Sequence, residues 1–184
     1  MHERVMIFID GANLFHGCNN FQKGYKVDLL KLRDELTAGR RLAGTYYYGA
    51  IPSNDSDKFS AQKKFLDMLS YNGFKVSAVP LKTHHVTVKC EYCGMENPTT
   101  EQVEKGVDVA LATDLIAFGI NNRYDTAILV SGDYDYFRAI QEVRKHGKRV
   151  EIAYFTGVGI SEEFILAADK FVSLNARASR ISRK

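Results

Sequence analysis

The stretch IFIDGANLFHG, residues 7–17, decides the fold prediction for this chain of 184 residues. It begins as a continuous apolar run of strand length, stops at Asp10, and continues into sequence that favours a helix. The stretch ILVSGDYDYF, residues 128–137, has the same build and carries Asp133 and Asp135 after its apolar run. In an open parallel sheet, strands end at the edge where ligands bind. The two stretches therefore predict an α/β fold with acidic residues at that edge.

The rest of the chain alternates strand-like and helix-like segments, which is typical of βαβ units. Strands are expected near residues 4–10, 43–50, 74–80, 126–131, 149–155 and 170–174, and helices near 28–38, 57–72, 103–120, 134–146 and 161–168. Apolar runs such as VMIFI and VEIAYF are expected for strands covered on both faces. We therefore predict a three-layer, Rossmann-like fold, with a parallel sheet flanked by helices.

The length fits a single domain, which we place at residues 1–176, with a basic C-terminal tail at 177–184. The segment 82–102 departs from the alternation, and we expect an irregular insertion there, containing cysteine and histidine. Hydrophobic residues make up 45% and charged residues 26% of the chain, ordinary values for a soluble globular protein.

The chain carries no recognisable signal sequence and no apolar run long enough to cross a bilayer. Its three cysteines suit a reducing compartment better than a disulfide framework. We therefore expect a cytoplasmic protein without a membrane partner.

The net charge is only +3, but basic residues cluster locally. The clusters are Arg40–Arg41, Lys63–Lys64, the segment 144–149, and the tail residues Arg177, Arg180, Arg183 and Lys184. An acidic pocket rimmed by basic groups would suit a phosphate polymer. The alternative is that each cluster is a solvated helix face or chain end.

Carboxylates gathered at one place repel one another, which raises their pKa values unless a cation lies between them. Oxygen ligands of this kind suit Mg²⁺ or Mn²⁺, and a cation held by carboxylates acts most naturally on phosphate esters. The structural alternative is that Asp10 caps a helix, while Asp133 or Asp135 caps another and the second acid lies in its first turn. Asp108 is expected in the first turn of a helix, and Asp114, about 120° further around it, is assigned a supporting or structural role.

Taken together, DGAN, KGVDVALATD and SGDYDYF resemble the NYN domain, a PIN-like nuclease family, and are most similar to its LabA-like bacterial branch, also called DUF88. The resemblance covers roughly residues 4–174. It implies a doubly wound sheet, an acidic pocket for Mg²⁺ or Mn²⁺, and cleavage of RNA.

Residue by residue, the resemblance implies catalytic and metal-binding roles for Asp10, Asp108 and Asp133, with support from Asp135. It also implies contacts to substrate or water from Asn13 and Ser131. Asp169 precedes the last expected strand and is either an accessory acid or a loop or cap residue. Members of the family can form dimers, so a homodimer is allowed.

Several aromatic residues could stack on nucleic acid bases. They are Tyr46, Tyr47, Tyr48, Tyr134, Tyr136 and Phe137. Tyr134 lies inside the acidic motif, and we therefore assign it to substrate binding. The alternative for each ring is packing in the core.

Cys90 and Cys93 have the spacing of a zinc knuckle, and His84 and His85 lie just upstream. A structural Zn²⁺ site is one interpretation. Adjacent residues of a strand point to opposite faces, so only one of the histidines would bind if the segment is extended. Ligands from elsewhere, such as His16 or Cys18, or ordinary thiols without zinc, are the alternatives.

The leading hypothesis is a metal-dependent ribonuclease, and the main alternative is a non-catalytic RNA-binding or regulatory module. A protein that acts on a nucleotide or a small phosphoester is a third. A haloacid-dehalogenase-like phosphatase needs a second acid two positions after the first, where this chain has Ala12. A dinucleotide site needs a glycine-rich turn that DGANLFHG lacks.

Overall fold

The computed structural model describes residues 3–52, 57–89, 92, 94–103 and 105–183. Its strands are β1 (Arg4–Asp10), β2 (Arg41–Ile51), β3 (Phe74–Pro80), β4 (Lys82–Lys89), β5 (Glu96–Val103), β6 (Thr126–Val130), β7 (Arg149–Tyr154) and β8 (Lys170–Ser173). Its α-helices are α1 (Gly11–Phe21), α2 (Leu29–Thr37), α3 (Asp57–Tyr71), α4 (Val107–Ile120), α5 (Phe137–Lys145), α6 (Glu162–Ala167) and α7 (Ala178–Ile181). Two short 3₁₀ helices are η1 (Tyr134–Tyr136) and η2 (Asn175–Arg177).

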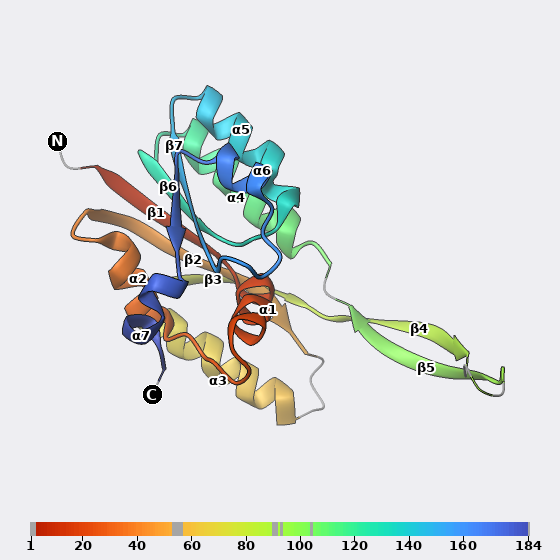
Figure 1. Cartoon of the computed structure of the whole chain (residues 1–184). Helices are drawn as coiled ribbons and strands as arrows, with labels where there is room; N and C mark the ends of the chain where they lie inside the picture. The colour runs from red at the N-terminus through yellow and green to blue at the C-terminus, as the bar shows by residue number, and fades with distance from the viewer. Residues whose placement is uncertain (1–2, 53–56, 90–91, 93, 104, 184) are drawn as a thin grey trace.

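Six strands form one parallel sheet in the order β3-β2-β1-β6-β7-β8. Helices cover both of its faces (Figure 1). The order reverses between β1 and β6, which makes this pair the topological switch point of a doubly wound sheet. The predicted three-layer α/β fold is confirmed.

The alternating side chains of β1 explain the two layers of helices. Val5, Ile7 and Ile9 are buried in a core cluster with residues of α1, α2 and α3. Met6 and Phe8, which point to the other face, are buried with residues of α4, α5 and α6. Because helices cover both faces of the sheet, every residue of β1 from Val5 to Ile9 is apolar.

The segment 82–102 is not irregular, and this expectation was wrong. β4 and β5 pair as an antiparallel hairpin, from Lys82 opposite Val103 to Lys89 opposite Glu96. The hairpin extends away from the body of the molecule (Figure 1). Threonine and valine are frequent in both strands, and their β-branched side chains favour extended backbone.

The residues expected to form a basic tail fold back onto the domain instead. Ile181 is fully buried and belongs to the core cluster under α2. Its carbonyl oxygen accepts a hydrogen bond from the backbone of Asp28 at 2.8 Å, and Arg183 donates to the carbonyl oxygen of Lys26 at 2.9 Å. Burial of one apolar side chain and these backbone hydrogen bonds order the segment.

Within the described ranges, no helix is both long enough and apolar enough to cross a membrane.

Candidate active site

Asp10 is the last residue of β1 and lies at the switch point of the sheet. Its neighbour Ile9 pairs with Val130, the last residue of β6. The chain leaves β1 into α1 on one face of the sheet and leaves β6 into η1 and α5 on the other face (Figure 1). The ends of β1 and β6 therefore border the crevice in which open parallel sheets bind ligands.

The carboxylate of Asp10 is held from three directions. Its Oδ1 accepts a hydrogen bond from the backbone N–H of Asn13 at 2.9 Å, which caps α1. Its Oδ2 accepts from the hydroxyl of Tyr136 at 2.9 Å and from the hydroxyl of Ser131 at 3.5 Å. Asp10 is only 6% exposed. These hydrogen bonds fix the orientation of one carboxylate at the end of β1.

Burial raises the pKa of Asp10 above its ordinary value. The hydrogen bonds from Asn13, Tyr136 and Ser131 oppose this shift, while the negative charge of Asp133 adds to it. An opposing positive charge would restore the ionised form.

The loops after β1 and β6 are joined by a second set of hydrogen bonds. The side-chain carbonyl of Asn13 accepts from the backbone N–H of Gly132 at 2.8 Å. The hydroxyl of Ser131 accepts from the backbone of Asp133 at 3.1 Å. A Cβ atom on Gly132 would come within 2.4 Å of the ring of Tyr154, so only glycine fits there. Asn13 and Ser131, predicted to contact substrate or water, thus shape the site from within.

Tyr136 shows which acids the fold brings together. Burial raises the pKa of its hydroxyl, and the charges of Asp10, Asp133 and Asp108 raise it further. Three acids from β1, the loop after β6 and the first turn of α4 therefore act on one hydroxyl group. Tyr136 was predicted to stack on bases or pack in the core. It is 1% exposed and its hydroxyl holds Asp10, a role that only the tertiary structure reveals.

The acids do not form a closed set of metal ligands in the described part of the chain, where no three carboxylate, imidazole or thiol groups are arranged to hold an ion. The structural alternatives explain why. Asp10 caps α1, and Asp133 caps η1 by accepting from the backbone of Asp135 at 3.0 Å. Asp108 and Asp135 are exposed. The donor atoms suit a hard divalent cation in kind, since all are carboxylate oxygens.

Two further acids have other partners. Asp114 accepts a hydrogen bond from the hydroxyl of Tyr48 at 2.8 Å, so it positions a buried ring on β2. Asp169 accepts from the backbone of Val150, near the start of β7, and pairs with Arg144 at 3.0 Å. All strands of the sheet run in the same direction, so the start of β7 lies at the opposite end of the strands from Asp10. Asp169 therefore does not belong to the site.

The aromatic residues predicted to stack on bases differ in how far they are buried. Tyr46, Tyr47 and Tyr48 are buried. Tyr134 is 42% exposed, stacks on Phe137 and donates a hydrogen bond to Glu163 of α6 at 2.8 Å. Tyr134 is thus the ring of the acidic motif that can meet a substrate.

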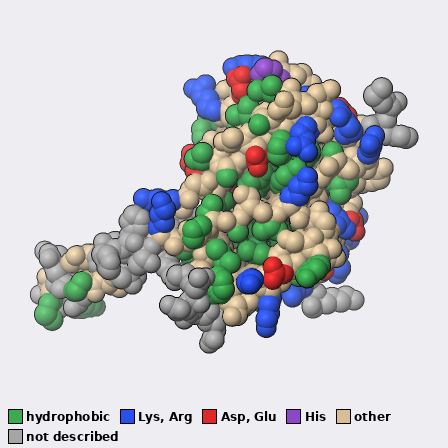
Figure 2. Space-filling view, turned by 180° about the vertical axis from the view of Figure 1, so that it is seen from behind, with side chains coloured by type: hydrophobic (Ala, Val, Ile, Leu, Met, Phe, Trp, Pro, Cys, Tyr) green, Lys and Arg blue, Asp and Glu red, His purple; other side chains and the backbone are tan. Residues whose placement is uncertain are grey.

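Two of the four basic clusters lie away from the acids. Arg40 and Arg41 lie at the start of β2, and the segment 144–149 leads into β7, so both clusters lie at the edge of the sheet opposite Asp10. On the face seen in Figure 2, Lys and Arg side chains are scattered around hydrophobic surface and do not form one continuous patch. The acidic crevice is therefore not enclosed by these two clusters.

The predicted zinc ligands Cys90 and Cys93 lie outside the described residues. His84 and His85 are consecutive positions of β4, opposite Glu101 and Thr100. The zinc interpretation stays a prediction.

A doubly wound parallel sheet with acids at its switch point defines this protein as a Rossmann-like α/β domain. Residues 4–175 match the NYN domain, and the chain belongs to the NYN domain family.

Two known proteins are similar to it. The low amplitude and bright protein LabA of Synechococcus elongatus is 26% identical over 184 residues, which cover 98% of this chain and 88% of LabA. The crystal structure of a protein of unknown function from Vibrio parahaemolyticus superposes with a TM-score of 0.68 at 21% identity, covering 94% of this chain and 93% of that one. The first confirms the resemblance to the LabA-like branch, and the second shows the same fold.

Proposed function

We propose that this chain is a metal-dependent ribonuclease that hydrolyses RNA phosphodiester bonds at the acidic crevice. The observation that carries the proposal is that Tyr136 and Ser131 both donate hydrogen bonds to Asp10 at the end of β1, while Ser131 also accepts from the backbone of Asp133. The negative charges of Asp133 and Asp108 act on the same Tyr136 hydroxyl. Mutual repulsion at such a place favours a bound cation. Membership of a nuclease-type family supports the same conclusion. RNA is the proposed partner and the cytoplasm the proposed compartment.

Each residue has a proposed role. Asp10, Asp108 and Asp133 would hold Mg²⁺ or Mn²⁺, which supplies positive charge for the oxygens of the reacting phosphate. Tyr136, Ser131 and Asn13 keep Asp10 in one orientation through the hydrogen bonds described above.

The exposed residues of the acidic motif would meet the substrate. Asp135 is exposed beside Asp133 and would receive a proton or orient water. The exposed ring of Tyr134 would stack on a base.

One observation favours the alternative, a non-catalytic RNA-binding or regulatory module. Asp10 and Asp133 both cap helices, and no three-ligand set is assembled among the residues that the structure describes. In that case the acids would stabilise the fold and perform no chemistry.

The test is cleavage of a structured and an unstructured RNA by the purified chain with Mn²⁺, with Mg²⁺ and with EDTA. The variants are Asp10→Asn and Asp133→Asn, because asparagine still caps a helix and the fold should be kept. Asp67→Asn, which changes an exposed carboxylate of α3, is the matched control. We expect cleavage that requires metal, is lost in both site variants and is unchanged in the control.

The proposal is contradicted if cleavage survives in both site variants. It is also contradicted if no cleavage occurs with Mg²⁺ and none with Mn²⁺. Binding of RNA without cleavage would support the non-catalytic alternative. A panel of small phosphoesters tests the third hypothesis, since a nuclease specific for polymers should leave them intact.

A further inference from the structure

A cavity lies next to Asp10, on the face of the sheet that α1 and α3 cover. Its volume is about 550 Å³. Gly11 and Ala12, the two residues that follow Asp10, form part of its wall. A ligand group in this cavity would therefore lie next to a phosphate at Asp10.

The wall of the cavity is rich in aromatic side chains. Tyr47 of β2 and Phe65 of α3 pack edge to face, with 5.6 Å between their ring centres. Phe15 of α1 is 61% exposed, which is unusual for a phenylalanine, and it also lines the cavity. The volume lies in the range of sites that hold small organic molecules, about 300–1,000 Å³. A planar apolar group of the size of a nucleobase fits such a wall.

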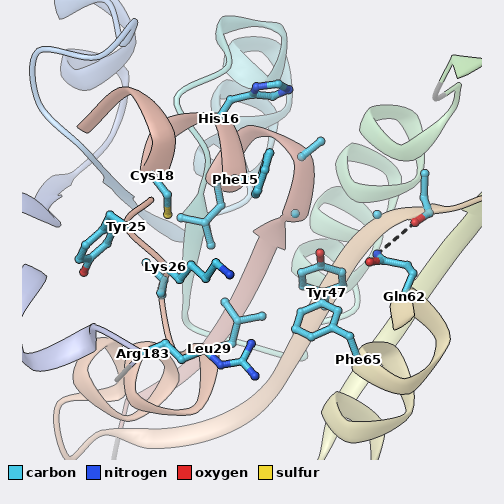
Figure 3. A pocket seen from close by; sticks show the side chains of 16 residues that line it. Phe15, His16, Cys18, Tyr25, Lys26, Leu29, Tyr47, Gln62, Phe65 and Arg183 are labelled. Atoms are coloured by element: carbon cyan, nitrogen blue, oxygen red, sulfur yellow. Dashed lines mark hydrogen bonds between the residues drawn. The ribbon is translucent and has the colours of Figure 1, made fainter. Parts of the chain in front are cut away.

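Two cations line the same cavity. Figure 3 shows the side chains of Lys26 and Arg183 together, across from the rings of Tyr47 and Phe65. Lys26 and Arg183 come from opposite ends of the chain, and the hydrogen bond from Arg183 N–H to the Lys26 carbonyl, at 2.9 Å, holds the two backbones together. The bridge between Val27 and Ser182 continues this pairing.

The two cations are available to a ligand. Both residues are exposed, and neither forms an ion pair with any residue that the structure describes. No described residue that lines the cavity is acidic. An aromatic wall beside two unpaired cations is complementary to a planar group that carries an anion.

We propose that this cavity binds one nucleotide of the RNA strand, with the base against Phe15 and Phe65 and a phosphate at Lys26 and Arg183. The inference rests on the proposed function in that RNA is the substrate. Gln62 donates to the carbonyl oxygen of Ala50 at 3.3 Å, which leaves its side-chain oxygen to accept from a base edge. The cavity would thus hold the base that lies beside the scissile phosphate.

The test is binding of a short fluorescent single-stranded RNA to the full chain in EDTA, where no metal-dependent cleavage takes place, measured by anisotropy at several salt concentrations. The first variant is Lys26→Ala/Arg183→Ala. Its control is Arg41→Ala/Arg149→Ala, which removes the same charge from exposed positions at the opposite edge of the sheet. The second variant is Phe15→Ala, and its control is Tyr71→Ala, an aromatic residue of α3 that is 92% exposed.

We expect Lys26→Ala/Arg183→Ala to weaken binding and to lower the slope of log K against log salt by about 0.7 for each phosphate that the variant no longer neutralises. We expect Phe15→Ala to weaken binding about fivefold or more. Both controls should bind as the wild type does. Equal binding by variants and controls, or weaker binding by the controls than by the variants, would overturn the inference.

A second readout separates this inference from the proposed function. Nucleoside 5′-monophosphates are titrated by calorimetry, with the parent nucleosides and ribose 5-phosphate as comparisons. We expect the monophosphates to bind more tightly than either part alone and to lose this advantage in Lys26→Ala/Arg183→Ala. If the chain cleaves RNA but the cavity variants bind normally, the cavity proposal is wrong and the nuclease proposal stands. If the variants lose binding but the wild type does not cleave RNA, the nuclease proposal is wrong and the cavity proposal stands.

Discussion

The hydroxyl of Tyr136 donates a hydrogen bond to Oδ2 of Asp10, with 2.9 Å between the two oxygens. Both residues are almost completely buried, at 1% and 6% exposure. Burial raises the pKa of Tyr136, the negative charges of Asp10, Asp133 and Asp108 raise it further, and the hydroxyl therefore keeps its proton. This hydrogen bond joins the acid at the end of β1 to the turn that follows β6.

Tyr136→Phe removes the hydrogen bond and leaves the rest of the ring in place. We expect a loss of about 1.5–3 kcal/mol in the free energy of unfolding, the usual range for a hydrogen bond to a charged group. Urea unfolding at neutral pH measures it. Tyr134→Phe is the control, because its exposed hydroxyl bonds to Glu163 at the surface. Equal losses in the two variants would show that the buried hydrogen bond stabilises the fold no more than the exposed one does.

The raised pKa of Asp10 makes the free energy of unfolding depend on pH, and it determines the sign of that dependence. The folded chain holds the proton of Asp10 to higher pH than the unfolded chain does, whose carboxyl has a pKa of about 3.9. The protonated form therefore stabilises the fold at low pH, and this contribution is lost as pH rises from the unfolded pKa through the raised one.

We expect the unfolding free energy of wild type to fall relative to Asp10→Asn as pH rises above about 4, because asparagine does not titrate. Urea unfolding in EDTA across this range gives the difference directly, and comparison with the variant cancels the other titrating groups. A difference that is constant, or that grows in favour of wild type as pH rises, would contradict the raised pKa.

Arg40 forms the most buried ion pair described in this chain. Its guanidinium donates to both carboxylate oxygens of Glu151, at 2.8 and 3.1 Å, and Glu151 is 3% exposed. Arg40→Ala leaves a buried carboxylate with Lys170 at 3.7 Å as its nearest remaining cation among the described residues. We expect a loss of about 3–5 kcal/mol in unfolding free energy. Arg41→Ala, at an exposed neighbouring position, should change it by less than about 0.5 kcal/mol.

Ile181 tests whether the C-terminal segment is part of the folded domain. Ile181→Ala removes a fully buried side chain, and we expect a loss of about 2–5 kcal/mol in unfolding free energy. Ser179→Ala changes an exposed position of the same helix and should have little effect. A loss below about 0.5 kcal/mol for Ile181→Ala would mean that the segment frays in solution.

The strands of the main sheet could be predicted because their sequence carries a strong local signal. VMIFI, residues 5–9, is apolar at every position, and only a strand covered on both faces needs that pattern. The helix expected near Asn13 and the position of Asp108 in a first turn are also confirmed. These features depend on neighbours in sequence, so no tertiary contact was needed to find them.

The hairpin and the C-terminal segment were missed for different reasons. In residues 82–103 the cysteines and histidines suggest a metal site, whereas the threonines and valines favour the strands that the structure shows. In residues 177–184 a single isoleucine lies among four basic residues, and its burial depends on contact with the loop before α2. No local pattern could have predicted that contact.

By itself, the sequence determined the parallel α/β fold and the placing of acids at strand ends, because hydrophobic periodicity and turn residues act over a few positions. Only the tertiary structure decided that Tyr136 holds Asp10 and that Asp169 lies at the opposite edge of the sheet. It also decided that Lys26 and Arg183 line one cavity. Those relationships join residues far apart in the chain, and they exist only once the strands have paired and the helices have packed on both faces.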